Sequence, residues 1–230
     1  MNKVKVRNVT IGDGNVTIQS MTNIPVTDVC QTLDQINALA VAGCDIVRIA
    51  VPNQAAKAFV EVRKQTEMPL VADIHFDYRL AVAAIEAGAD KIRINPGNMQ
   101  TSQLDVVLDC AKAHNVPIRI GVNGGSLSKA AIERAQNGQL DGLTAQITDK
   151  NLDNAAKLRV AALADSVAEY VRYFETRNFC DIVLSVKSSD VRQMIAANKL
   201  VAKLGYPMHL GVTEAGLARQ GIVKNSVGIG

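Results

Sequence analysis

Short apolar runs alternate with longer segments of helical periodicity along most of the chain. Seven runs have the length of a strand and predict parallel strands at about 16–21, 46–49, 69–75, 91–94, 117–122, 181–186 and 207–213. Helical spacing of apolar residues predicts helices at about 33–40, 54–65, 79–87, 102–114, 153–177 and 190–204. Strands that alternate with helices favour a parallel sheet with right-handed crossovers. The pattern therefore predicts an α/β fold.

The chain begins with two β-rich runs, 4–11 and 15–21, separated by Gly12-Asp13-Gly14-Asn15. Gly, Asn and Asp between two alternating runs are typical of a hairpin turn. An N-terminal β-hairpin is therefore expected, with its turn at 12–15.

One further strand would complete a (β/α)8 barrel, the TIM barrel, but residues 217–227 have a helical pattern. An open sheet and a TIM-type barrel that stops before its last strand both fit this count. The second is favoured, because an open seven-stranded sheet leaves two long unprotected edges. We expect residues 1–230 to form one TIM-barrel domain, incomplete at its C-terminal end. The polar excursion at 124–152 fits an active-site lid and a surface insertion equally well.

Composition narrows the possible classes of protein. The formal net charge is only +3 and no dense Lys/Arg run occurs, which disfavours nucleic acid as a partner. No apolar run has membrane-spanning length and the first residues do not resemble a signal peptide, so a cytoplasmic protein without a membrane partner is expected. The four cysteines form no Cys-x-x-Cys pair; Cys44, Cys110 and Cys180 lie in apolar segments and are interpreted as small buried hydrophobic residues.

Polar side chains recur at the carboxyl ends of the predicted strands. Residues two apart share a face of a strand, which pairs Asp73 with His75, Arg93 with Asn95, Arg119 with Asn123, Ser185 with Lys187, and His209 with Thr213. An internal repeat of 45 residues also places Arg48 where its second copy has Arg93. Several cations at one rim predict an anion-binding cavity, and Arg and Lys together suit a diphosphate.

Glu214 is the lone carboxylate beyond the last predicted strand, where it suits a general acid/base or a group that holds a substrate hydroxyl. Two alternatives stay open for the other residues. Arg48 and Arg93 also fit ion pairs with Asp45, Asp73 or Asp90. Asp73, His75 and His209 have the residue types of a metal site, although the surrounding cations would repel a divalent ion.

Six blocks of sequence resemble the hydroxymethylbutenyl diphosphate synthase family, also called GcpE or IspG, and follow its order over nearly the whole chain. These blocks are Ser20-Met21-Thr22-Asn23, residues 71–76, residues 91–98, residues 120–127, Ser185-Val186-Lys187 and residues 209–216. The resemblance implies a TIM barrel that binds 2-C-methyl-D-erythritol 2,4-cyclodiphosphate at its carboxyl face. It also implies an oxidoreductase that makes 4-hydroxy-3-methylbut-2-enyl diphosphate in the methylerythritol phosphate route to isoprenoids.

In this family a C-terminal domain holds a [4Fe-4S] cluster through three Cys and one Glu, and ferredoxin or flavodoxin supplies electrons. The resemblance implies a homodimer and assigns catalysis to Glu214. It assigns substrate binding to Arg48, Asp73, His75, Arg93, Asn95, Arg119, Asn123, Lys187 and His209. The cysteines do not match the family's cluster ligands and no cluster domain follows. We therefore expect no metal ligands in this chain, no bound cluster and no turnover by the chain alone.

Two other functions remain open. One is a cofactor-free TIM-barrel transferase or lyase that acts on a diphosphate ester, as a pterin-synthase-like barrel does. The other is a non-catalytic module that binds a phosphate ligand. A dinucleotide-binding domain is disfavoured, because no Gly-x-Gly-x-x-Gly opens the helix after the first parallel strand.

Overall fold

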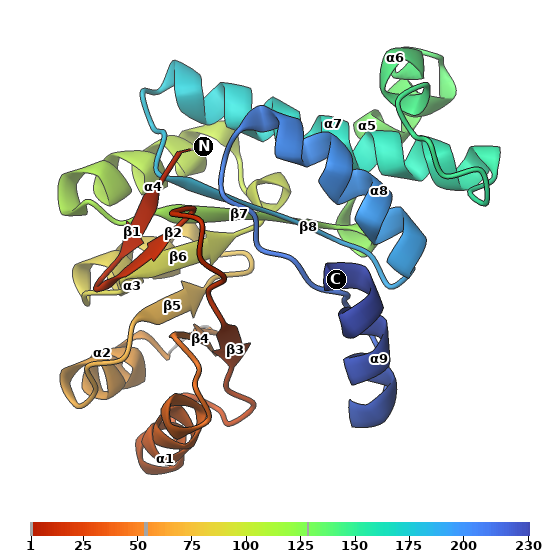
Figure 1. The fold of residues 1–230 in the computed structure, drawn as a ribbon. Coiled ribbons are helices and arrows are strands. Elements are labelled where there is room, and N and C mark those ends of the chain that lie inside the picture. The colour runs from red at the N-terminus through yellow and green to blue at the C-terminus, as the bar shows by residue number, and fades with distance from the viewer. Residues whose placement is uncertain (1, 53–54, 128) are drawn as a thin grey trace. The chain divides into compact units, whose positions relative to one another are not determined.

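The computed structural model describes residues 2–52, 55–127 and 129–230 (Figure 1). The chain divides into two compact units, and each is treated by itself. The first unit holds Met1–Arg119 with Arg177–Val183, and the second holds Ile120–Thr176 with Leu184–Gly230.

The first unit contains a hairpin and four strand–helix repeats. Its elements are β1 (Val4–Val6), β2 (Val9–Ile11), β3 (Gln19–Met21), α1 (Val29–Val41), β4 (Ile46–Ala50), α2 (Ala56–Lys64), β5 (Leu70–Asp73), α3 (Tyr78–Glu86), β6 (Lys91–Ile94), the 3₁₀ turn η1 (Pro96–Asn98) and α4 (Thr101–His114). Two strands begin in this unit and continue in the second, namely β7 (Ile118–Asn123) and β8 (Ile182–Lys187).

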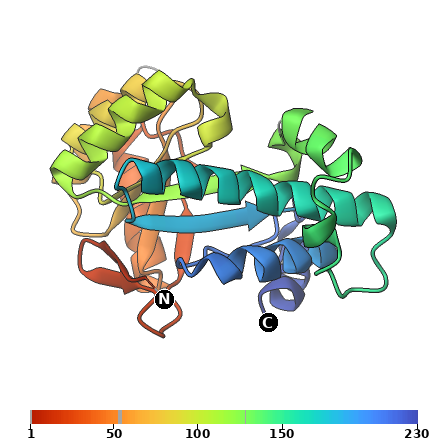
Figure 2. The ribbon, with the colours of Figure 1, turned by 90° about the horizontal axis from the view of Figure 1, so that it is seen from above.

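The second unit is mainly helical. Besides the ends of β7 and β8 it contains η2 (Gly124–Ser126), α5 (Lys129–Gln136), α6 (Asp141–Thr144), α7 (Asn154–Thr176), α8 (Val191–Val201), η3 (Ala202–Leu204) and α9 (Ala218–Ile229). In Figure 2, α7 is the longest helix, and it packs against both α5 and α8. None of the helices in the described ranges is long and apolar enough to cross a membrane.

Six strands hydrogen-bond in chain order from β3 to β8, and β3 to β6 pair in parallel. The register places Met21 beside Arg48 and Asp73 beside Arg93. Parallel strands that alternate with helices were predicted from the sequence, and the helix and strand positions agree to within a few residues for most elements.

The 45-residue repeat has a structural counterpart. Helices α1 and α3 are each followed by a glycine with positive φ, Gly43 at 88° and Gly88 at 87°, which lets the chain reverse into the next strand. In both copies the aspartate two residues later accepts a backbone N–H: Asp45 from Ile18 and Asp90 from Leu70. The repeat therefore conserves the turn that starts each strand, and it places Arg48 and Arg93 third in β4 and β6.

The predicted N-terminal hairpin is present, but its predicted turn is wrong. The single run 4–11 forms both strands, and β1 pairs with β2 around Arg7 and Asn8, with Arg7 at a φ of 55°. Residues 12–15 instead form a loop in which the Asp13 carboxylate accepts the Asn15 N–H. This local side-chain bond replaces a cross-strand ladder at 12–15.

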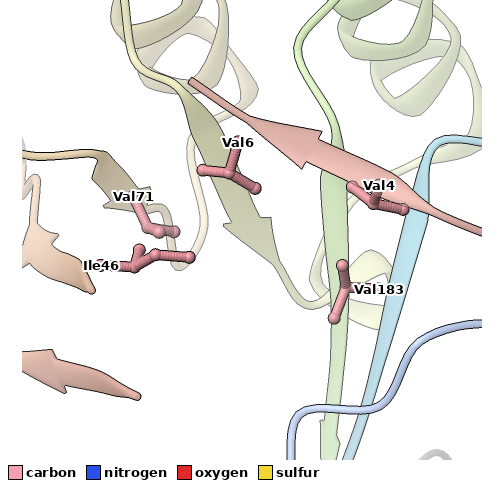
Figure 3. Packing of buried hydrophobic residues seen from close by; sticks show 5 residues of the cluster. All are labelled: Val4, Val6, Ile46, Val71 and Val183. Atoms are coloured by element: carbon pink, nitrogen blue, oxygen red, sulfur yellow. The ribbon is translucent and has the colours of Figure 1, made fainter. Parts of the chain in front are cut away.

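The hairpin packs on the amino ends of the parallel strands in the first unit. Figure 3 shows Val4 and Val6 of β1 beside Ile46, Val71 and Val183, all nearly or fully buried. Ile46 begins β4, and the other two lie second in β5 and β8. The apolar cluster at the amino ends of the strands stabilises the fold. In barrel enzymes the active site lies at the opposite, carboxyl ends.

The excursion 124–152 forms helices that pack on α7 in the second unit. Ala131 and Ala135 of α5, with Leu140, meet Ala161 and Ala162 of α7 in a buried apolar cluster. Arg134 reinforces it through ion pairs to Asp165 and Glu169 of α7, each at 2.7 Å. The excursion is thus held by its own core and charge pairs.

The predicted strand at 207–213 is not a regular strand. In the described chain it forms one isolated bridge, Met208 with Leu184 of β8, and the His209 N–H bonds the Leu184 carbonyl. Further along, the Val212 N–H bonds the Asn225 side chain at 2.8 Å instead of a neighbouring strand. The Asn225 side chain of α9 thus takes the place of strand pairing at Val212. The predicted count of seven parallel strands was therefore too high by one.

Candidate functional site

A buried carboxylate lies at the centre of the charged residues in the first unit. Asp73, the last residue of β5, is only 3% exposed. Its carboxylate oxygens lie 3.7 Å from Arg48 Nε, 3.3 Å from an Arg93 terminal nitrogen and 3.3 Å from His75 Nε2. These partners come from β4, β6 and the loop after β5, so the predicted convergence of Arg48, Asp73, His75 and Arg93 is present. Of the three carboxylates considered as ion-pair partners, Asp73 is the one they use.

Two further cations belong to this group. Arg119, second in β7, is 1% exposed, and Lys91, first in β6, is fully buried. Burial lowers the pKa of Arg119 well below its ordinary value, and the positive charges of Arg48 and Arg93 lower it further while Asp73 opposes this. Burial, with the charges of Arg119 and Arg48, lowers the pKa of Lys91 to about 7.

Positive charge exceeds negative charge in this group. Three guanidinium groups, of Arg48, Arg93 and Arg119, surround the single carboxylate of Asp73. Within the described chain, Arg93 Nε and the Thr22 hydroxyl are buried without a hydrogen-bond partner. Buried polar atoms are rarely left unbonded in proteins, and such atoms beside excess cations suit the oxygens of an anionic ligand.

The loops at the carboxyl ends of β5 and β6 are tied together. Asn95 is buried after β6 and its side chain accepts the Gly97 N–H at 3.2 Å, which shapes the turn η1. Asn98 in that turn donates to the His75 carbonyl at 2.9 Å. An open cavity of about 800 Å³ lies beside His75 and is also lined by Phe76, Arg79 and Gln103. Space for a ligand therefore exists next to the predicted residue.

The second unit holds the remaining predicted residues, Asn123, Lys187, His209 and Glu214. Lys187 ends β8, and its ammonium lies against the backbone of Gly211: a Cβ placed there would be 3.3 Å from Lys187 Nζ. Glu214 is exposed and has a φ of 50°, an unusual backbone conformation for a residue with a side chain. Lys187 and the 209–216 loop are thus brought together, as their sequence blocks implied.

Among the described residues, no three His, Cys, Asp or Glu side chains gather in a way that would hold a metal ion. All four cysteines are free thiols. The interpretation of the cysteines as buried hydrophobic residues holds for Cys44, but Cys110 is only partly buried and Cys180 is exposed, because it lies in the loop before β8 and not in the strand. The residues described therefore do not fit an iron–sulfur cluster.

Two residues of the site were missed by sequence reasoning. Lys91 shares a strand face with Arg93, two residues later, and this parity was available in the sequence. Thr22 follows β3 directly, and its N–H bonds the Arg48 carbonyl at 3.0 Å. Its position after a strand end and its place in the block Ser20-Met21-Thr22-Asn23 were the signals, but a lone threonine there is common in loops.

A protein-family model described as the GcpE TIM-barrel domain matches residues 1–230. Among curated proteins, the 4-hydroxy-3-methylbut-2-en-1-yl diphosphate synthase (flavodoxin) of Maridesulfovibrio salexigens is 49% identical over 95% of this chain and 56% of its own length. The protein of the same name from Thermotoga petrophila is 46% identical over 99% of this chain and 60% of its own length. The chain spans between 55% and 61% of the length of the first such relatives.

Among solved structures, a dihydropteroate synthase from Burkholderia cenocepacia complexed with 7,8-dihydropteroate has a TM-score of 0.57 and 12% identity, and the match covers 98% of this chain and 94% of that one. At this identity the likeness concerns the fold alone. Together with the family model it confirms the predicted barrel class of α/β fold.

Proposed function

Because the chain belongs to the GcpE TIM-barrel family, we propose that it is the substrate-binding barrel of a 4-hydroxy-3-methylbut-2-enyl diphosphate synthase. Its ligand is then 2-C-methyl-D-erythritol 2,4-cyclodiphosphate, which the whole enzyme converts reductively in isoprenoid biosynthesis. The observation that carries the proposal is the excess of guanidinium groups around Asp73 in the first unit, one of them buried and two partly buried. A dianionic ligand would balance that excess and bond the buried Arg93 Nε.

Each candidate site residue of the first unit has a specific role in this proposal. Arg48, Arg93 and Arg119 bind diphosphate oxygens, and Asp73 holds the Arg48 and Arg93 side chains in place while the site is empty. His75 and Asn95 lie on the two loops at the carboxyl ends of β5 and β6 and donate further hydrogen bonds to the ligand. Arg48 and Arg93 are pre-organised by their contacts with Asp73 and Arg119 by its burial, so little side-chain entropy is lost on binding.

For the second unit, Asn123, Lys187 and His209 remain proposed ligand-binding residues and Glu214 the proposed acid/base, on the strength of the sequence blocks that contain them. A [4Fe-4S] cluster would supply electrons in the whole enzyme, from ligands outside these residues. Relatives carry flavodoxin in their names, so we propose flavodoxin as the donor in preference to ferredoxin. The homodimer and the cytoplasmic location also remain predictions.

A ³¹P NMR titration of the cyclic diphosphate with the purified chain tests the proposal. We expect both phosphorus resonances to broaden and shift at stoichiometric protein, and a large excess of dihydropterin diphosphate to leave them bound. Preferential binding of the pterin ester would favour the cofactor-free transferase. Equal displacement by inorganic phosphate would favour a general phosphate-binding module, and either result would overturn the assignment.

A further inference from the structure

Lys91 has no part in the function proposed above, yet its position is unusual. It is the first residue of β6, fully buried, and shares a strand face with Arg93 two residues further along. The register sets Lys91 beside Val71 and Arg93 beside Asp73 on β5. Lys91 therefore lies two residues closer to the amino end of β6 than Arg93, which pairs with Asp73.

The partners of Lys91 leave its charge uncompensated. Its ammonium donates to the Gln19 side-chain oxygen of β3 at 3.2 Å, a neutral acceptor. The charged groups that face it are cations, Arg119 on β7 and Arg48 on β4. On β5, Asp73 forms its ion pairs with Arg48, His75 and Arg93, and among the described residues no carboxylate pairs with Lys91.

A buried amine among guanidinium groups favours its uncharged form, since an isolated buried charge is costly. Burial, then the charges of Arg119 and Arg48, bring the pKa of Lys91 to about 7, against an ordinary value of 10.5. Near neutral pH the amine is therefore poised between its two forms. An incoming dianion offsets the positive charges around the amine and so favours the ammonium form.

We propose that Lys91 becomes a cation of the anion site only when a ligand binds. Its amine takes up one proton from solvent when a phosphate-bearing ligand enters beside Arg93, Arg48 and Arg119. The inference rests on the proposed function, because it needs an anionic ligand in this group of residues. The free protein thereby avoids a further positive charge beside the three guanidinium groups, and the complex gains one. Lys91 acts through the charge balance of the site and is a positioning residue.

Proton uptake makes affinity depend on pH. If the amine is uncharged in the free protein and charged in the complex, affinity falls by up to about tenfold per pH unit above pH 7, by linkage. The fraction of a proton taken up is about 0.9 at pH 8 and about 0.1 at pH 6 for a free pKa near 7. The cyclic diphosphate itself does not titrate here, because each of its phosphorus atoms carries only one strongly acidic group, unlike a phosphate monoester with a second pKa of about 6.

Calorimetric titration with the cyclic diphosphate in buffers of different ionisation enthalpy measures this uptake directly. At pH 8 we expect close to one proton for the unmodified chain and for Lys64→Met, a control at an exposed lysine in α2. The Lys91→Met variant should still bind but take up almost none. The contribution of His75, which contacts Asp73, is separated by His75→Gln, which should keep most of the uptake at pH 8.

The outcomes are distinguishable. Absence of binding in every buffer refutes the proposed function and with it the inference. Binding without proton uptake at pH 8, or equal uptake by the unmodified chain and Lys91→Met, refutes the role of Lys91 alone. Loss of the uptake in His75→Gln would assign the proton to the histidine instead. Lys91→Gln provides a second neutral side chain with hydrogen-bonding capacity, and it should lose the uptake as Lys91→Met does.

Discussion

Replacing Asp73 by Asn tests the charge balance at the centre of the site. The amide has almost the shape of the carboxylate but no charge, so the packing around a residue that is 3% exposed is preserved. The change leaves Arg48, Arg93 and Arg119 without their common negative neighbour. The variant should therefore fold with lower stability, and its stability should depend more strongly on a bound anion.

The expected size follows from the contacts. At an effective dielectric constant near 20, charges 3.3 to 3.7 Å apart attract by about 4–5 kcal/mol in each of the two Arg–Asp73 pairs, and the desolvation of the buried groups cancels much of this. Removal of one partner from a buried pair typically costs about 3–5 kcal/mol. With a urea m-value of about 2–3 kcal/mol/M, the midpoint of unfolding should fall by about 1–2 M.

Urea unfolding followed by circular dichroism measures this loss, since the chain has no Trp for fluorescence. Asp109→Asn is the control, because Asp109 is 80% exposed and 4.0 Å from Lys112, a pair expected to contribute less than about 1 kcal/mol. Inorganic diphosphate should raise the midpoint of Asp73→Asn more than that of the unmodified chain. A loss no larger than that of the control, or equal stabilisation of both proteins by diphosphate, would refute the reasoning.

Four further predictions concern other parts of the chain. Gly211→Ala should weaken binding of the cyclic diphosphate several-fold in a titration, because the added Cβ would lie 3.3 Å from Lys187 Nζ. The control Gly142→Ala should bind normally, because a Cβ there meets nothing within 4 Å, and equal affinities of the two variants would contradict the prediction. Val4→Ala should lower stability by about 2 kcal/mol in urea, for two buried methyl groups, against almost nothing for the exposed Val16→Ala; similar losses would exclude a stabilising hairpin. Folding lowers the pKa of Lys91 from 10.5 to about 7, so the unfolded chain binds more protons in this window; stability should rise with pH across it, and Lys91→Met should lack that part of the rise. Anaerobic reconstitution should leave the chain without stoichiometric iron and sulfide, and a [4Fe-4S] cluster found by chemical assay would disprove the expectation.

The strand–helix order, the repeat and the carboxyl-end location of the polar residues could be predicted because they depend on local rules. Apolar periodicity marks the elements, and parity places Asp73 with His75 on one face. The hairpin turn was mispredicted because glycine-rich 12–15 has the stronger turn composition, whereas Arg7 adopts its positive φ within a pairing of only three residues a side. The position of the turn depends on tertiary packing, because it lets Val4 and Val6 enter the apolar cluster of Figure 3.

The partners of the charged residues could not be deduced from the sequence. Asp45, Asp73 and Asp90 were equivalent candidates there, but Asp90 pairs with Arg63 at 2.7 Å and Asp45 caps the Ile18 N–H. Lys91 was overlooked because a lysine at the start of a strand is usually solvated, and only the structure shows it fully buried. The failed strand at 207–213 likewise depends on Asn225, a residue from a helix further along the chain.

Calorimetric titration of the chain with 2-C-methyl-D-erythritol 2,4-cyclodiphosphate, beside an Arg119→Met variant, tests whether the cations around Asp73 bind the diphosphate. Methionine keeps much of the buried volume of Arg119 and removes the charge, so circular dichroism should show both proteins folded. We expect one ligand per chain, with affinity at least tenfold weaker in the variant and falling with added salt in the unmodified chain. Failure of the folded chain to bind, or equal affinity in both proteins, would contradict this expectation.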